Sequence, residues 1–236
     1  MPNEVLLFLT VFIDFGGVVL FYYLFGRGGL FAWTVLATIS ANIEVLLVVD
    51  AFGLEQTLGN VLFASTFLVT DILSEMYSKK VAETAVNIGI LASVFFIVIS
   101  QLWLVFTPSA SDWAMESIQA IFSNTPRLML SSFLVYAISQ RFDVWAYHKW
   151  WDFTSNKFGD RSRFLWLRNN GSTLISQLLN AVLFNVAAFW GTYDAGTLIS
   201  LCAATYVIYI ACSLLDTPFV YLARKIHPLS DRVVEE

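Results

Sequence analysis

Charged residues are scarce in this sequence. Asp, Glu, Lys and Arg make up only 13% of its 236 residues, about half of the roughly 25% that soluble domains carry, while 58% are hydrophobic. The apolar residues form blocks of about 20 or more, the length that a helix needs to cross a bilayer. The composition therefore excludes a soluble globular protein and predicts a polytopic membrane protein of the all-α class.

Cysteine and histidine are also nearly absent. The two cysteines, Cys202 and Cys212, fall in one apolar block, which favours small buried side chains over a disulfide or a metal site. The sequence contains no CxxC, HExxH or Walker-type motif. We therefore predict no metal, no cofactor and no enzymatic activity. The N-terminus lacks the positive region of a signal peptide and is expected to remain as a membrane helix.

Seven blocks are long enough to cross about 30 Å of hydrocarbon as helices. They cover residues 4–26, 29–51, 57–77, 82–107, 119–147, 169–191 and 196–223. The fifth block is too long for one span, and residues 112–124 favour an amphipathic helix at the membrane surface, with Pro126 starting the span itself. The largest loop, roughly 148–168, is too short for a core of its own, so any function is expected within the bundle.

Positive charge is distributed unevenly among the predicted loops. Twelve of the thirteen Lys and Arg residues fall on one side, and only Arg127 lies on the other. The positive-inside rule makes the first side cytoplasmic, which places the N-terminus outside and the C-terminus inside. Trp145, Trp150, Trp151 and Trp166 flank the largest loop, as expected of residues at the membrane interface.

The third block contains two carboxylates, Asp71 and Glu75, four residues apart. On a helix this spacing places both on one face, next to Phe63 and Phe67. A charged residue at the bilayer centre costs roughly 2.5–3.5 kcal/mol, so the deeper residue, Asp71, needs a partner or a function. Glu75 lies about one turn from Lys79 and can equally extend to the membrane surface.

Polar residues follow one helical face in other blocks too. Such stripes suit either hydrogen bonds between helices or a shared polar cavity for a small solute. Repeated carboxylates favour the cavity, because an unpaired buried charge costs more than a hydrogen bond returns. Arg127 could pair with one of them or extend to the outer surface. The stripes comprise Glu44; Ser132, Tyr136, Gln140 and Asp143; Thr173, Ser176, Gln177 and Asn180; and Asp216.

Carboxylate, carboxamide and aromatic side chains together suit a flat heterocycle such as guanine. A carboxylate accepts two hydrogen bonds from the N–H/NH2 edge, Gln or Asn binds the carbonyl side, and an aromatic ring covers the face. Other planar amides fit the same set. An intramembrane aspartyl protease, with Asp71 facing Asp143 or Asp216, is the alternative enzyme class, but the Gly-rich context of such enzymes is missing.

Residues 67–77, followed by Lys79 and Lys80, resemble the signature of the queuosine precursor transporter family, within the vitamin uptake transporters. Residues 127–143, 168–177 and 216–219 are similar to further blocks of that family, and the resemblance covers roughly residues 29–226. Two positions depart from the family pattern: Ser78, where glycine is common, and Asn180, where aspartate is expected.

The resemblance implies uptake of a 7-deazaguanine for tRNA modification, such as 7-cyano-7-deazaguanine (preQ0) or 7-aminomethyl-7-deazaguanine (preQ1). It also implies six spans with both termini cytoplasmic, a topology that the second to seventh predicted spans reproduce, while the additional first span moves the N-terminus outside. Residues 28–226 then form the six-helix bundle, residues 1–27 an extra N-terminal transmembrane helix, and residues 227–236 a cytoplasmic tail. We expect the substrate to contact Phe67, Asp71, Glu75, Phe133, Gln177 and Asn180, with gating or coupling at Glu44, Arg127, Asp143 and Asp216, and also at Glu75.

Two ways of energising transport stay open at this level. The chain either transports without an ATPase or is the substrate-binding component of an energy-coupling-factor-type transporter with a separate ATPase module. Ala37-x-x-x-Ala41 offers a small-residue face for close helix contact with such a module. We expect a multi-pass protein of the cytoplasmic (inner) membrane that binds no nucleic acid; self-association and proton coupling stay open.

Overall fold

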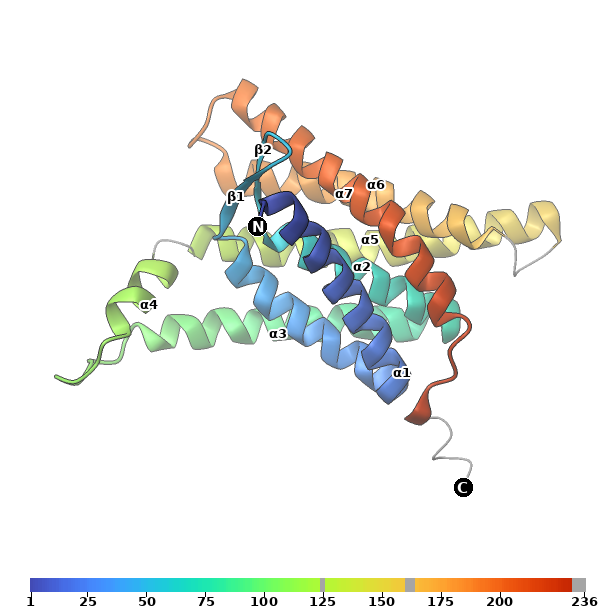
Figure 1. The fold of residues 1–236 in the computed structure, drawn as a ribbon, viewed down its shortest axis with the longest axis horizontal. Helices are drawn as coiled ribbons and strands as arrows, with labels where there is room; N and C mark the ends of the chain where they lie inside the picture. The colour runs from blue at the N-terminus through green and yellow to red at the C-terminus, as the bar shows by residue number, and fades with distance from the viewer. Residues whose placement is uncertain (124–125, 160–163, 231–236) are drawn as a thin grey trace.

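The computed structural model describes residues 1–123, 126–159 and 164–230. Arg161, Arg163 and Arg232, three of the cations used to orient the chain, lie outside these residues, as does the end of the predicted tail. The elements are α1 (Asn3–Glu44), β1 (Val48–Ala51), β2 (Leu54–Thr57), α2 (Gly59–Met76), α3 (Lys79–Trp103), α4 (Met115–Phe122), α5 (Pro126–Phe158), α6 (Leu165–Phe189) and α7 (Ala195–Ala223) (Figure 1).

The long helix α1 is interrupted at Gly26. This residue has φ 56° and ψ −137°, a backbone conformation open almost only to glycine. The two halves of α1 fold back on each other there and lie side by side (Figure 1). They correspond to the first two predicted helices. The second half ends at Glu44, however, and not at residue 51 as predicted.

Gly29 closes this turn against the backbone of Phe21. A Cβ atom at Gly29 would lie 2.0 Å from the Phe21 carbonyl oxygen. Gly29→Ala is therefore expected to lower the free energy of unfolding by about 1–3 kcal/mol, as overpacking does. Gly28→Ala is the matched control, because a Cβ there meets no atom within 4 Å. Equal thermal stability of the two variants in detergent would contradict this packing.

A β-hairpin replaces the last turns of the predicted second span. β1 and β2 pair antiparallel, from Val48 opposite Thr57 to Ala51 opposite Leu54. Both residues of the tight turn, Phe52 and Gly53, have positive φ, as a type I′ hairpin turn requires. The start of α1 is hydrogen-bonded to this hairpin: Asn3 Nδ2 donates to the Asp50 carbonyl at 2.8 Å, and the Phe52 N–H donates to Glu4 Oε1 at 3.1 Å.

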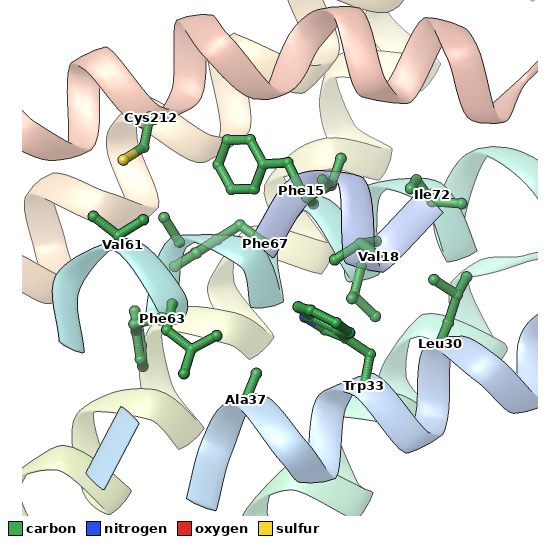
Figure 2. Packing of buried hydrophobic residues seen from close by; sticks show 14 of the residues in the cluster. Phe15, Val18, Leu30, Trp33, Ala37, Val61, Phe63, Phe67, Ile72 and Cys212 are labelled. Atoms are coloured by element: carbon green, nitrogen blue, oxygen red, sulfur yellow. The ribbon is translucent and has the colours of Figure 1, made fainter. Parts of the chain in front are cut away.

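Helix α2 lies at the centre of the bundle. Every residue from Gly59 to Ser74 is buried, and α1, α3, α5 and α7 all pack against it. α6 packs against both α5 and α7. Figure 2 shows the apolar part of this core, where Phe15 and Val18 from the first half of α1 and Trp33 from the second half surround Phe67 of α2. Polar residues of α2 are thereby kept away from lipid, where they would be costly.

Four of the described helices, α1, α3, α6 and α7, are long and apolar enough to span a membrane. The bundle is thus all-α apart from the hairpin, as predicted for the class. Which end faces the cytoplasm is still the prediction from the loop charges.

The short helix predicted at 112–124 is present as α4, Met115–Phe122, and α5 begins at Pro126, as predicted.

The two helices on either side of the predicted large loop, α5 and α6, are longer than expected. α5 then continues to Phe158, about three turns past the predicted end at 147, and α6 begins at Leu165 instead of 169. Most of the expected loop is therefore helical. Tertiary contacts stabilise this extension, since Trp150 of α5 lies against Gly171 of α6.

Candidate functional site

Buried polar side chains gather where α2, α5, α6 and α7 meet. Three of them are carboxyl groups, Asp71, Asp143 and Asp216, each at most 1% exposed. Polar groups in a protein interior are costly unless they are hydrogen-bonded, so atoms without partners indicate where a ligand can bind. We define the polar core as these three carboxyl groups together with six further buried polar residues: Gln140, Asn169, Thr173, Ser176, Gln177 and Asn180.

Asp71 connects α2 to α6 through one of its two oxygens. Its Oδ2 accepts a hydrogen bond from Thr173 Oγ1 at 3.1 Å. Its Oδ1 is buried and has no hydrogen-bond partner among the described residues. The carboxyl group is therefore held in place with one oxygen left to accept from a ligand.

Asp143 and Gln177 also carry unused hydrogen-bonding groups. Asp143 Oδ1 accepts from Ser176 Oγ at 2.9 Å, while its Oδ2 has no partner in the described part of the chain. Gln177, the next residue on α6, is completely buried, and neither its Oε1 nor its Nε2 is paired within the same residues. Leaving such groups unpaired costs about 1–3 kcal/mol each, so their presence favours a ligand site over interhelical contacts.

Gln140 and Asp216 differ, because they already hold helices together. Gln140 Nε2 donates to Thr66 Oγ1 at 2.6 Å, and its Oε1 accepts from Thr70 Oγ1 at 3.3 Å, joining α5 to α2. Asp216 Oδ1 accepts from Asn169 Nδ2 at 2.8 Å, joining α7 to α6. These bonds position the walls of the polar core.

A chain of neutral hydrogen bonds lies on one side of the polar core. Ser139 Oγ donates to Asn180 Oδ1 at 3.3 Å, and Asn180 Nδ2 donates to the Tyr209 hydroxyl at 2.8 Å. The Tyr209 hydroxyl donates in turn to Asn60 Oδ1 at 3.4 Å. These four residues, called the amide layer below, come from α5, α6, α7 and α2 in that order.

A small cavity lies beside the amide layer. Its volume is about 20 Å³, enough for about one water molecule. It lies where α2 and α5 begin, the end of the bundle predicted to face outward. The lining residues are Ala41, Val45, Gly59, Asn60, Phe63, Ser132, Asn180, Phe184 and Tyr209.

Phe63 supplies the central aromatic contact at this cavity. Its ring centre lies 5.6 Å from that of Phe67, 5.9 Å from that of Tyr136 and 6.4 Å from that of Tyr209. Phe67 itself is completely buried in the apolar core, and Phe133 is half-buried on α5. The aromatic surface that lines the cavity therefore comes from Phe63, Tyr209 and Phe184.

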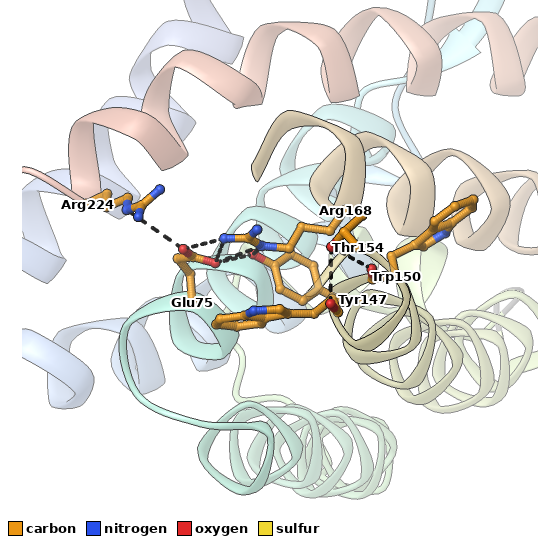
Figure 3. Close-up of polar contacts among 7 residues, drawn as sticks. Glu75, Tyr147, Trp150, Thr154, Arg168 and Arg224 are labelled. Carbon is orange, nitrogen blue, oxygen red and sulfur yellow. Dashed lines mark hydrogen bonds and ion pairs between the residues drawn. The ribbon is translucent and has the colours of Figure 1, made fainter. Parts of the chain in front are cut away.

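Glu75 lies at the opposite end of α2, in a charged cluster with Tyr147, Arg168 and Arg224 (Figure 3). Arg168 Nη2 lies 2.6 Å from Glu75 Oε1, and Arg168 Nε donates to Oε2 at 3.0 Å. The Tyr147 hydroxyl donates to Oε2 at 2.9 Å, and Arg224 Nε lies 3.8 Å from Oε1. Glu75 is thus bound within the bundle and does not extend to the surface beside Lys79.

The charged cluster joins all four helices that form the polar core. Arg168 is completely buried in the first turn of α6, and its guanidinium carbon lies 4.5 Å from the centre of the Trp151 ring of α5. Arg224 directly follows α7. A buried ion pair with hydrogen bonds to each charge holds its partners in one arrangement, because breaking it leaves a charge without compensation.

The two remaining predicted gating residues lie at the other end of the bundle. Arg127 Nε and Nη2 donate to the carbonyl oxygens of Ala187 and Trp190, at 3.0 and 2.7 Å. A cation at this position complements the negative C-terminal end of α6. Among the described residues, Arg127 contacts these backbone carbonyls and no carboxylate. Glu44 is half-buried at the last position of α1.

Sequence reasoning missed two contributors to this region. The predicted cytoplasmic loop includes Arg168, although this residue lies four residues before Ser172 and eight before Ser176, on the polar face of α6. The predicted polar stripes do not include Tyr209, although it lies seven residues before Asp216 and so on the same face of α7. Within the described chain, no group of three or more His, Cys, Asp and Glu residues could hold a metal ion.

Comparison with known proteins places this arrangement in a family. The family profile "Putative vitamin uptake transporter" matches residues 57–223, which contain the whole polar core. A "Probable queuosine precursor transporter" of Bacillus subtilis (strain 168) is 37% identical over 230 residues, 98% of each chain. A "Queuosine precursor transporter" of Escherichia coli (strain K12) is 28% identical over 162 residues, 68% of this chain and 67% of that protein. No solved structure matches the chain.

The alignment with the Bacillus subtilis protein extends over nearly the full length of both chains, so it includes most of α1 as well as the region that the profile matches. Both relatives are named as transporters, and the profile describes a transporter family. The protein is therefore a transporter and not an enzyme, and it belongs to the queuosine precursor transporter family within the vitamin uptake transporters.

Proposed function

We propose that this protein imports a queuosine precursor, a 7-deazaguanine such as preQ0 or preQ1, across the cytoplasmic membrane for use in tRNA modification. The names of its relatives support this substrate class. The single observation that carries the proposal is the set of buried polar-core atoms that have no hydrogen-bond partner among the described residues: Asp71 Oδ1, Asp143 Oδ2, Asn169 Oδ1 and both polar atoms of Gln177.

These groups match the hydrogen-bonding edge of a guanine ring. The ring N1–H and the 2-amino group are adjacent donors, which a carboxylate such as Asp71 accepts. The 6-oxo group is an acceptor, which the Gln177 Nε2 amide can satisfy. The ring face is apolar and flat and suits the aromatic surface of Phe63 and Tyr209. Phe67 and Phe133 remain the predicted stacking residues from the sequence.

Transport requires the helices around the polar core to separate. The cavity of about 20 Å³ admits about one water and no bicyclic heterocycle. On the predicted orientation, the amide layer and this cavity face outward, and the charged cluster closes the cytoplasmic end. We assign Glu75 with Arg168 to the cytoplasmic gate, which must open for release while the outer end closes, as in alternating access.

The structure offers no exposed small-residue face at Ala37 and Ala41 for an ATPase module. Both residues are buried, and Gly59 at the start of α2 packs closely against the Ala41 carbonyl. We therefore favour transport by this chain without a separate ATPase.

Uptake by the purified chain in proteoliposomes tests this proposal. We expect labelled preQ0 or preQ1 to accumulate in vesicles that contain only this protein, and unlabelled 7-deazaguanine to compete for uptake. Protein-free vesicles provide the background. Binding without uptake, followed by uptake when an ATPase module is added, would support the energy-coupling-factor type instead. Absence of binding to both compounds would refute the substrate assignment.

A further inference from the structure

We infer that the amide layer recognises the substituent at position 7 of the heterocycle and selects a neutral group, such as the nitrile of preQ0, over the ammonium group of preQ1. The inference rests on the proposed function. It adds to that function the orientation of the ligand and the residues that distinguish one precursor from another.

The orientation follows from the order of polar residues along α6. Thr173, Gln177 and Asn180 are four and three residues apart, so they lie on one face of the helix. Thr173 holds Asp71, and Asn180 belongs to the amide layer. At 1.5 Å per residue these three levels extend over about 10 Å, comparable to the long dimension of a substituted bicyclic ring.

The groups on one edge of a 7-deazaguanine have the same order. The 2-amino group and N1–H come first, the 6-oxo group next, and the 7-substituent last. With the two donors on Asp71 and the 6-oxo group on Gln177, the 7-substituent points toward Asn180. The reverse orientation would direct the 6-oxo acceptor at a carboxylate, which has no proton to donate when ionised.

The surroundings of Asn180 are neutral. Asn60, Ser139 and Tyr209 complete the amide layer, and every described side chain that lines the adjacent cavity is uncharged. An ammonium group buried here would lose its hydration without a carboxylate partner, which is costly. A nitrile is a neutral acceptor and suits the amide and hydroxyl donors of this layer. The free oxygen of Asp143 does not change this, because Asp143 is bonded to Ser176, one turn away on α6.

Competition binding to the purified full-length protein tests the inference. Unlabelled preQ0 and preQ1 compete separately against a labelled 7-deazaguanine, and the ratio of their Kd values is the readout. We expect the wild type to prefer preQ0. Asn180→Asp supplies a carboxylate at the substituent and is expected to shift the ratio toward preQ1 by roughly 10- to 100-fold, as a charge-assisted hydrogen bond would.

Two further variants make the test decisive. Asn60→Asp places a carboxylate at the other end of the amide layer and is expected to shift the ratio in the same direction, which covers the case that Asn180→Asp does not fold. Asn87→Asp is the control, because Asn87 lies on α3 beside Arg141, outside the polar core, and its ratio should match the wild type.

The outcomes separate this inference from the proposed function. A wild type that binds both compounds with a ratio unchanged in Asn180→Asp and Asn60→Asp would overturn the inference and leave the function intact. A wild-type preference for preQ1 would overturn it as well. A wild type that binds neither compound would overturn both.

Discussion

Asp71→Asn is expected to abolish high-affinity binding and uptake of the 7-deazaguanine substrate. The variant keeps one side-chain oxygen, so it can still accept from Thr173 and hold α2 against α6. It replaces the free Oδ1 by an amide that donates and cannot accept from N1–H or the 2-amino group. Losing one partner of a buried, charge-assisted contact costs about 2–5 kcal/mol, or roughly 30-fold to several thousand-fold in Kd.

The measurement is equilibrium binding of labelled preQ0 and preQ1, together with thermal unfolding in detergent. Because the substitution removes a buried carboxyl group, thermal stability should not fall. Glu83→Gln is the matched control: it makes the same chemical change at a side chain that is 48% exposed and pairs only weakly with Lys79. Wild-type affinity in a folded Asp71→Asn protein would refute the assignment of Asp71. Normal binding with lost uptake would move Asp71 from recognition to coupling.

Glu75→Gln is expected to be the most destabilising single change at the proposed cytoplasmic gate. It leaves the guanidinium of Arg168, which is completely buried, without its carboxylate partner. Breaking a buried ion pair in this way costs about 3–5 kcal/mol, which for a chain of this size lowers the apparent Tm by on the order of 10 °C. Glu83→Gln, which breaks an exposed pair, should change the Tm little.

The double variant Glu75→Gln/Arg168→Met separates the stability of the gate from its function. Removing both charges is expected to restore most of the lost stability, because no charge then stays buried alone. Since Glu75 contacts Arg168 and Tyr147 in the charged cluster, we expect substrate affinity close to that of the wild type but a clearly altered uptake rate. Loss of binding in the stable double variant would instead place Glu75 in the substrate site, as the sequence alone suggested.

Local patterns were sufficient to predict where the long helices of this chain lie. Blocks of apolar residues located both halves of α1, and Pro126 located the start of α5. The ends of helices were less predictable. The hairpin at residues 48–57 and the extension of α5 to Phe158 depend on contacts with distant residues, such as Glu4 with Phe52 and Trp150 with Gly171. Such contacts leave no periodic signal in the chain.

For the candidate site, too, local spacing predicted part of the arrangement and contacts between distant residues decided the rest. Helical spacing alone indicated that Gln177 and Asn180 share the polar face of α6 with Ser176, because side chains three and four residues apart project from one side. It could not indicate which helix faces that side. The pairing of Thr173 with Asp71, and of Ser176 with Asp143, became visible only with the packed bundle.

The sequence by itself determined that this is a membrane-embedded helical protein with buried acids, because apolar length and helical spacing are local properties of the chain. Only the tertiary structure decided which acids have a free oxygen and which are paired. Asp71 and Glu75 carry the same carboxyl group on one helical face, yet Glu75 pairs with Arg168, 93 residues away, while Asp71 keeps one oxygen without a partner among the described residues. The physical reason is that hydrogen-bond satisfaction depends on neighbours in space, which helix packing sets and sequence spacing does not.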